Sequence, residues 1–151
     1  MCETERRPGD IFLTRWADEE KNTTPGHWNH AAILMDGWQI VEAQMAPNTV
    51  LVEDFDVFWN RYAEIVVLRV NHVLGHSIGL RMASNARLIV GSPYRKIASG
   101  FNFLRRSGRG ENCVSVVRKC YRDAVGDDPG WTYPDDIAKK HGRIFTVVSR
   151  K

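Results

Sequence analysis

Short apolar runs rich in β-branched residues occur along this chain between longer stretches in which apolar residues recur every three or four positions. The short runs predict strands, and the longer stretches predict amphipathic helices. The predicted strands cover residues 10–15, 50–53, 64–70 and 143–148, and a hairpin of two further strands lies within residues 26–43. The predicted helices cover residues 55–62, 75–90 and 112–125, with a single helical turn at 133–138 and loops at 16–26 and 99–110.

The order of these elements places most strands first, the helices later and one strand at the end. A chain of 151 residues is long enough to bury a core without disulfides or metals. We therefore predict one α+β domain over residues 1–151, with residues 1–7 as a flexible tail.

The hairpin carries ionisable residues in otherwise apolar strands. His30 opens its first strand and Glu42 lies near the end of its second, where an unpaired polar group would be costly to bury. A two-residue turn at 36–37 would place Ala43 opposite His30. A three-residue loop at 35–37 instead places Glu42 opposite His30 on the same face, with Gly37 in a left-handed conformation. We predict the three-residue loop, because it explains why both strands carry an ionisable group.

A cysteine at the start of a predicted helix completes a possible catalytic set. Cys113 follows Asn112, a residue type favoured at the N-cap. The helix dipole lowers the pKa of a cysteine in the first turn, and the backbone N–H groups there can bind an oxyanion. The candidate catalytic residues are thus Cys113 as nucleophile, His30 as base and Glu42 as the group that orients His30. His27, in the preceding Pro-Gly loop, is the competing base, and Cys120 on the same helix face is a core residue.

Composition and charge exclude several other functions. The three cysteines show no disulfide or zinc-binding spacing, and a set of His27, His30 and Cys113 lacks a fourth metal ligand, so we predict no metal. No glycine-rich phosphate loop is present, so we predict no cofactor. The net charge is +3, and the basic run at 105–109 lacks interleaved aromatic residues, which argues against a nucleic-acid partner. A polar N-terminus and the lack of a long apolar run predict a cytoplasmic protein with no transmembrane segment.

The motifs together resemble the circularly permuted branch of the NlpC-type papain-like cysteine hydrolases, the YaeF/YiiX-like amidases. The matching segments occur in the permuted order, with the histidine before the cysteine; they are Gly9-Asp10-Ile11, Asn29-His30-Ala31-Ala32-Ile33, Ile40-Val41-Glu42-Ala43, Gly91-Ser92-Pro93-Tyr94, Asn112-Cys113 and Pro134-Asp135-Asp136-Ile137-Ala138. The family usually follows its cysteine with a small hydroxyl residue and a glutamate, whereas Val114 and Ser115 stand here.

The resemblance implies a small antiparallel, barrel-like sheet packed against the helix that bears the nucleophile. It also implies thiolate attack on an acyl carbonyl, with a small peptide, an amide or an acyl lipid as substrate. Trp28, Tyr94 and Phe101 are the residues we expect to line the substrate cleft. Two alternatives stay open. One is a lipid acyltransferase or phospholipase like the lecithin:retinol acyltransferase group, which carries a second histidine where this chain has Glu42. The other is a lipid- or peptide-binding domain of the same fold without turnover.

Overall fold

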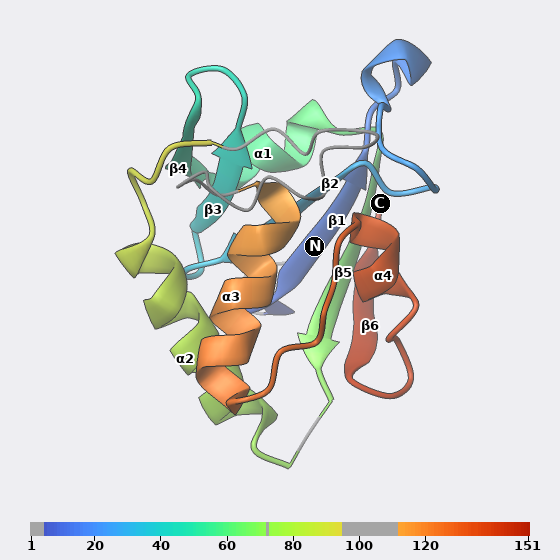
Figure 1. The fold of residues 1–151 in the computed structure, drawn as a ribbon. Coiled ribbons are helices and arrows are strands. Elements are labelled where there is room, and N and C mark those ends of the chain that lie inside the picture. Colours follow the sequence, from blue (N-terminus) through green and yellow to red (C-terminus); the bar gives the residue numbers. More distant parts are fainter. Residues whose placement is uncertain (1–4, 72, 95–111) are drawn as a thin grey trace.

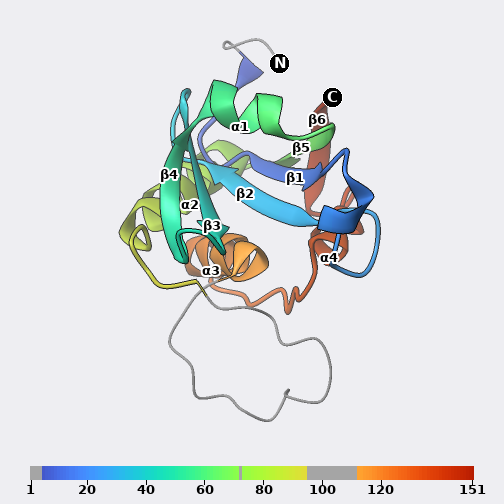
Figure 2. The same cartoon turned by 90° about the horizontal axis from the view of Figure 1, so that it is seen from above.

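A six-stranded antiparallel sheet forms the centre of the molecule, and helices lie on both of its faces (Figures 1 and 2). The computed structural model describes residues 5–71, 73–94 and 112–151. The strands are β1 (Ile11–Arg15), β2 (His30–Leu34), β3 (Gln39–Gln44), β4 (Thr49–Asp54), β5 (Glu64–Val70) and β6 (Phe145–Arg150), in the spatial order β4-β3-β2-β1-β5-β6. The helices are α1 (Phe55–Arg61), α2 (Gly75–Leu88), α3 (Cys113–Val125) and α4 (Pro134–Ala138), with a 3-10 turn, η2, at Glu19–Lys21. The α+β class and the sheet packed against the cysteine-bearing helix are confirmed.

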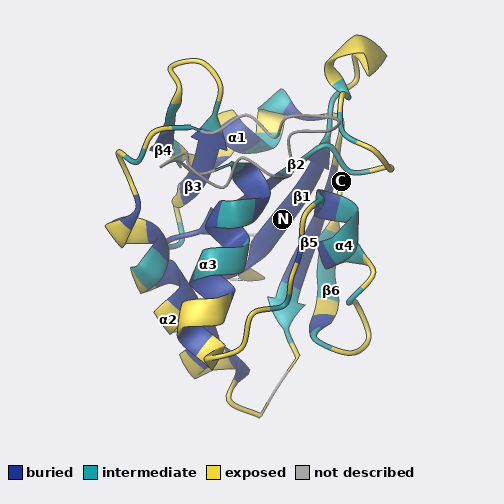
Figure 3. Cartoon of the chain, viewed as in Figure 1, coloured by how far each residue is buried: buried dark blue, intermediate teal, exposed yellow. Residues whose placement is uncertain are grey.

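Both faces of the sheet are buried, which explains the nearly continuous apolar sequence of its central strands. Ile11 and Leu13 of β1 belong to the core under α2 and α3, whereas Phe12 between them packs against α1 on the other face. Figure 3 shows the exposed residues on the outer surfaces of the helices and in the loops. The chemistry of a residue in this sheet therefore depends on which of two helical layers it faces.

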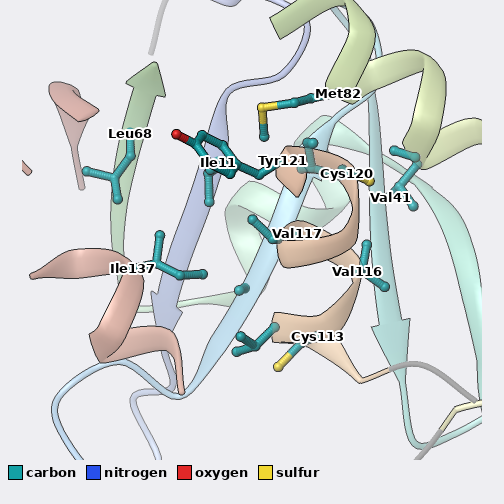
Figure 4. Close-up of a cluster of buried hydrophobic side chains, with 14 of the residues drawn as sticks. Ile11, Val41, Leu68, Met82, Cys113, Val116, Val117, Cys120, Tyr121 and Ile137 are labelled. Atoms are coloured by element: carbon teal, nitrogen blue, oxygen red, sulfur yellow. The ribbon is translucent and has the colours of Figure 1, made fainter. Parts of the chain in front are cut away.

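Helix α3 begins and ends at the residues that the sequence predicts. The Asn112 side chain accepts a hydrogen bond from the Ser115 N–H at 2.9 Å, and the Ser115 hydroxyl accepts one from the Asn112 N–H at 2.7 Å. Gly126 ends the helix with a left-handed φ of 88°. The inward face of α3 packs on the sheet (Figure 4) through Cys113, Val114, Val116, Val117, Cys120, Tyr121 and Ala124.

The loop of the β2–β3 hairpin lies one residue further along the chain than predicted. Ala32, not His30, is paired with Glu42, and the Met35 N–H donates to the Gln39 carbonyl across the loop. The cause is Asp36, whose carboxylate accepts the N–H groups of both Trp38 and Gln39 at 2.9 Å and so fixes the turn at 36–38. The prediction that Gly37 is left-handed is wrong, because Gly37 is not among the residues with a positive φ.

Residues 5–7, which we assigned to a flexible tail, make specific contacts. The Arg6 guanidinium donates to the Gly37 carbonyl at 2.9 Å and lies 3.7 Å from the centroid of the Phe55 ring. The Arg7 N–H donates to the Asp10 carboxylate. Residues 1–4 lie outside the described residues, as do Phe101 and the predicted loop at 99–110. In the described part of the chain, no helix has both the length and the apolar character needed to cross a bilayer.

Helix α2 approaches the start of β1 so closely that two glycines are required. Gly9 has a φ of +85°, and a Cβ atom there would lie 2.4 Å from the Cα of Gly79 in α2. A Cβ atom on Gly79 would lie 2.6 Å from the Pro8 carbonyl oxygen, which belongs to the backbone and cannot turn aside. These two glycines therefore set the distance between α2 and the sheet.

We expect Gly79→Ala to lower the free energy of unfolding by about 1–2 kcal/mol, because forcing apart a packed helix and strand outweighs the ~1 kcal/mol that alanine gains in helix propensity. Gly37→Ala is the matched control, since a Cβ atom there meets nothing within 4 Å. It should change stability by no more than about 0.5 kcal/mol. Chemical denaturation of both variants measures the difference, and equal stabilities would contradict the close-packing argument.

Candidate active site

The structure brings the three candidate catalytic residues together from three elements. His30 is the first residue of β2, Glu42 lies in β3, and Cys113 is the first residue of α3. His30 Nε2 lies 2.7 Å from Oε2 of Glu42, and the His30 ring also hydrogen-bonds the Cys113 thiol. The imidazole therefore connects the thiol to the carboxylate.

This connection passes from one face of the sheet to the other. Cys113 belongs to the core between the sheet and α2 and α3, whereas Glu42 points toward α1 and contacts Arg61 there. His30 stands at the end of its strand, so its ring reaches both residues. Glu42 lies opposite Ala32, which is two residues from His30 in β2. His30 and Glu42 are therefore diagonal neighbours on one face of the sheet, a separation that long side chains can span.

The site is shielded from solvent. The Glu42 side chain is 0% exposed, the His30 side chain is 13% exposed, and Cys113 is buried. Low exposure strengthens the interactions between the three groups, because few water molecules screen them.

The surroundings of Cys113 and His30 favour a thiolate–imidazolium pair. Burial alone would raise the pKa of Cys113, but the hydrogen bond and charge of His30, with the Ala31 and Val114 N–H groups, lower it below the ordinary value of 9.0. Burial alone would lower the pKa of His30. The hydrogen bonds to Cys113 and Glu42, with the negative charge of the Cys113 thiolate, outweigh burial and raise the pKa of His30 well above 6.5. The two shifts go in the directions that move a proton from sulfur to imidazole.

Glu42 has two hydrogen-bond partners in addition to His30. Arg61 Nη1 donates to its Oε1 at 2.8 Å, and Gln44 Nε2 donates to the same oxygen at 2.5 Å. Arg61 also binds Glu53 through its other terminal nitrogen. Burial opposes ionisation of Glu42, but the hydrogen bond and charge of His30, with help from Glu53 and Arg61, lower its pKa. Glu42 therefore stays ionised in a position that water does not reach.

Tyr62 closes the site on the side of α1. Its ring is stacked on the His30 ring, with centroids 5.9 Å apart and planes 19° from parallel. Tyr62 is 3% exposed, and burial raises the pKa of its hydroxyl. The flat contact restricts rotation of the imidazole.

The loop before His30 is fastened to α4 by Asp135. The two carboxylate oxygens accept the N–H groups of His27 at 3.1 Å and Trp28 at 2.8 Å. Gly26 has a φ of +100° where this loop passes the carboxylate, and a Cβ atom there would lie 2.3 Å from it. Asp135 thus sets the path of the chain two residues before His30.

The other sequence candidates have distinct positions. The His27 ring is exposed and lies 3.1 Å from the Glu64 carboxylate. Trp28 is half-buried against the core beneath α3, and Tyr94 packs against the same core. Burial raises the pKa of Tyr94, and negative charge on Cys113 adds to that shift, so Tyr94 lies within electrostatic range of the thiol. Phe101 lies outside the described residues.

Four residues that contact the site were not singled out from the sequence. Gln44 follows Glu42 at a strand spacing of two, which places both on one face. Arg61 and Tyr62 end the aromatic-rich helix, whose pattern indicated only core packing. Asp135 belongs to a motif that the sequence shows. Its contacts with His27 and Trp28, more than a hundred positions earlier in the chain, leave no pattern in the sequence around it.

Comparison with known proteins agrees with this fold and shows the family. The model of a family described as permuted papain-like amidase enzymes, YaeF/YiiX, C92, matches residues 5–132. The chain therefore belongs to this family of papain-like cysteine hydrolases. The crystal structure of the metalloprotein YiiX from Escherichia coli O157:H7 has a similar fold, with a TM-score of 0.63 and 19% sequence identity over 95% of this chain and 89% of that one. No curated protein matched the chain.

The description of YiiX as a metalloprotein raises the question of a metal site here. Among the described residues, no group of three or more His, Cys, Asp or Glu side chains is arranged to hold a metal ion. Of the candidate residues, Glu42 already forms hydrogen bonds with His30, Arg61 and Gln44. The described donor set therefore does not fit a metal ion.

We expect iodoacetamide to alkylate Cys113 with an apparent pKa below 9.0, because only the thiolate reacts and His30 stabilises it. In His30→Ala the rise in rate should move to higher pH, since the main group that lowers the thiol pKa is gone. Mass spectrometry of the Cys113 peptide measures the rate, and the fully buried Cys120 is the internal control. Coinciding pH profiles for the wild type and His30→Ala would contradict this account.

Proposed function

We propose that this amidase cleaves a peptide or amide bond through a Cys113–His30–Glu42 triad and an acyl-enzyme intermediate. The observation that supports it best is the hydrogen-bonded connection from the thiol through the imidazole to a buried carboxylate. The pKa shifts of Cys113 and His30 support the same roles, because they favour a nucleophile and a proton donor in one resting state.

In the first step, the Cys113 thiolate attacks the carbonyl carbon and the carbonyl oxygen becomes an oxyanion. Backbone N–H groups in the first turn of α3 have no partner within the helix, and that of Cys113 is the donor we assign to the oxyanion. The His30 imidazolium then gives its proton to the leaving nitrogen as the C–N bond breaks. A thioester on Cys113 and a free amine result.

In the second step, neutral His30 takes a proton from water, and the resulting hydroxide attacks the thioester carbonyl. The C–S bond breaks, the acid leaves, and the thiolate and imidazolium are restored. Glu42 orients the ring through Nε2 and stabilises the positive charge that His30 carries in the resting and attacking states. Arg61 and Gln44 hold Glu42 in place for this task.

The family favours an amide over a lipid ester as the substrate. Trp28 and Tyr94, which pack on the core beside the catalytic residues, are the described residues that we assign to the cleft walls. The lipid acyltransferase alternative has less support, because Glu42 stands where that group carries a second histidine. A binding domain without turnover would not need a thiol with a lowered pKa.

We expect Cys113→Ala and His30→Ala each to abolish turnover of a peptide p-nitroanilide, because members of a triad act as a unit. A p-nitrophenyl ester should form a covalent acyl adduct on Cys113 in the wild type, detectable by mass spectrometry. His27→Ala is the matched control, since its ring is exposed and binds Glu64. A larger loss in His27→Ala than in His30→Ala would show that the wrong base has been assigned.

Glu42→Gln should lower kcat on the order of tenfold to a thousandfold, because the amide orients the ring but stabilises the imidazolium less. The alkaline limb of kcat/KM should also move to lower pH, since Glu42 helps to raise the pKa of His30. Glu64→Gln, which alters the exposed His27–Glu64 pair, is the control and should leave both quantities unchanged. An unchanged pH profile in Glu42→Gln would exclude the assigned role.

A further inference from the structure

A cavity lies on the same face of the sheet as α3, between α4 and strands β5 and β6. Its volume is about 270 Å³, which is below the usual size of a pocket for a whole drug-sized ligand but ample for one large side chain. Figures 1 and 2 show α4 and α3 on this one face, with α4 nearer to β6. Residues of the β1–β2 loop, β5, α4 and β6 line the cavity, among them Trp28, Val66, Leu68, Val147, Lys139 and Arg150.

The floor and the inner wall of this cavity are apolar. Val66 and Leu68 of β5 form the floor, and Val147 of β6 is paired with Leu68 beside it. Trp28 and Ala138 add apolar atoms on the walls. A side chain that enters would therefore gain hydrophobic contacts in proportion to the apolar area it buries.

The rim carries positive charge that the lining does not neutralise. Lys139 and Arg150 are exposed, and neither side chain forms an ion pair or hydrogen bond within the described residues. Asp135, the carboxylate of the lining, already accepts two backbone N–H groups. Asp136, which interacts electrostatically with Lys139, likewise accepts the N–H groups of Thr132 and Tyr133. An anion at the rim would therefore meet two cations that form no ion pair with a described carboxylate.

The cavity lies at a defined distance from the thiol. Val66 in its floor is paired with Leu13 of β1, which is paired with Ala31 of β2. The Ala31 N–H hydrogen-bonds the Cys113 sulfur. Neighbouring strands are about 4.8 Å apart, so two strand spacings separate the floor from this contact by roughly 10 Å. An extended peptide covers that distance in about three residues.

We propose that this cavity is a subsite for the carboxyl-terminal residue of a short peptide substrate. The apolar side chain of that residue occupies the floor over Val66 and Leu68, and its free carboxylate binds Lys139 and Arg150. The scissile bond lies about three residues away, at Cys113. The inference rests on the proposed amidase function, and it names the class of substrate as a peptide with an apolar residue at a free carboxyl terminus.

Direct binding tests the cavity without any turnover. We expect N-acetyl-leucine to bind Cys113→Ala in the millimolar range, and its uncharged methylamide to bind at least about tenfold more weakly. The double variant Lys139→Glu/Arg150→Glu, made in the same background, should lose the preference for the carboxylate. Arg81→Glu/Arg143→Glu, which changes the charge equally on two exposed residues outside the lining, should keep it. Two-dimensional NMR titration gives both the affinities and the residues that shift.

Kinetics on the active enzyme separate this inference from the proposed function. With peptides that end in leucine, the double variant should raise KM about tenfold or more for the peptide with a free carboxylate. It should leave KM unchanged for the same peptide with a carboxy-terminal amide. Its kcat and the alkylation profile of Cys113 should match the wild type. If turnover requires Cys113 but N-acetyl-leucine and its methylamide bind equally, the subsite is wrong and the amidase function stands. Binding of decanoate that depends on Lys139 and Arg150, without binding of N-acetyl-leucine, would also overturn it.

Discussion

The buried charge of Glu42 is the constraint on which the architecture of the site depends. An ionised carboxylate with no exposed surface is tolerated only when its oxygens are paired and hydrogen-bonded. Its partners come from β2, β3 and the end of α1, through His30, Gln44 and Arg61. In the mechanism we propose, the same charge supports the His30 imidazolium, so stability and chemistry would depend on one set of hydrogen bonds.

The end of strand β2 brings these groups into contact although they belong to different layers. Cys113 is packed in the core under α2 and α3, and Glu42 faces α1 across the sheet. A residue in the middle of a strand points to one face only, but His30 at the strand end contacts both. The Tyr62 ring and the Asp135 carboxylate fix this end from two sides, the first by stacking and the second through the backbone of residues 27 and 28.

Local sequence predicts the start of α3 and the shared face of His30 and Glu42, although the predicted hairpin register differs from the observed one. Asn112 predicted the start of the helix, because capping depends on neighbouring residues only. The predicted and observed hairpin registers differ by two residues, and a shift of two leaves every side chain on the same face. His30 and Glu42 therefore share a face as predicted, although Ala32 is the residue opposite Glu42. The loop position was missed because it depends on which N–H groups Asp36 accepts.

The sequence by itself determined the elements, the permuted order of the motifs and the identity of the thiol, imidazole and carboxylate, because periodicity and capping act over a few residues. Only the tertiary structure decided that Arg61 neutralises Glu42, that Asp135 binds a loop more than a hundred residues earlier, and that Lys139 and Arg150 flank one cavity. These contacts join residues far apart in the chain. They depend on how helices and strands pack against one another, and hydrophobic periodicity specifies which face is buried but not which distant side chain it meets.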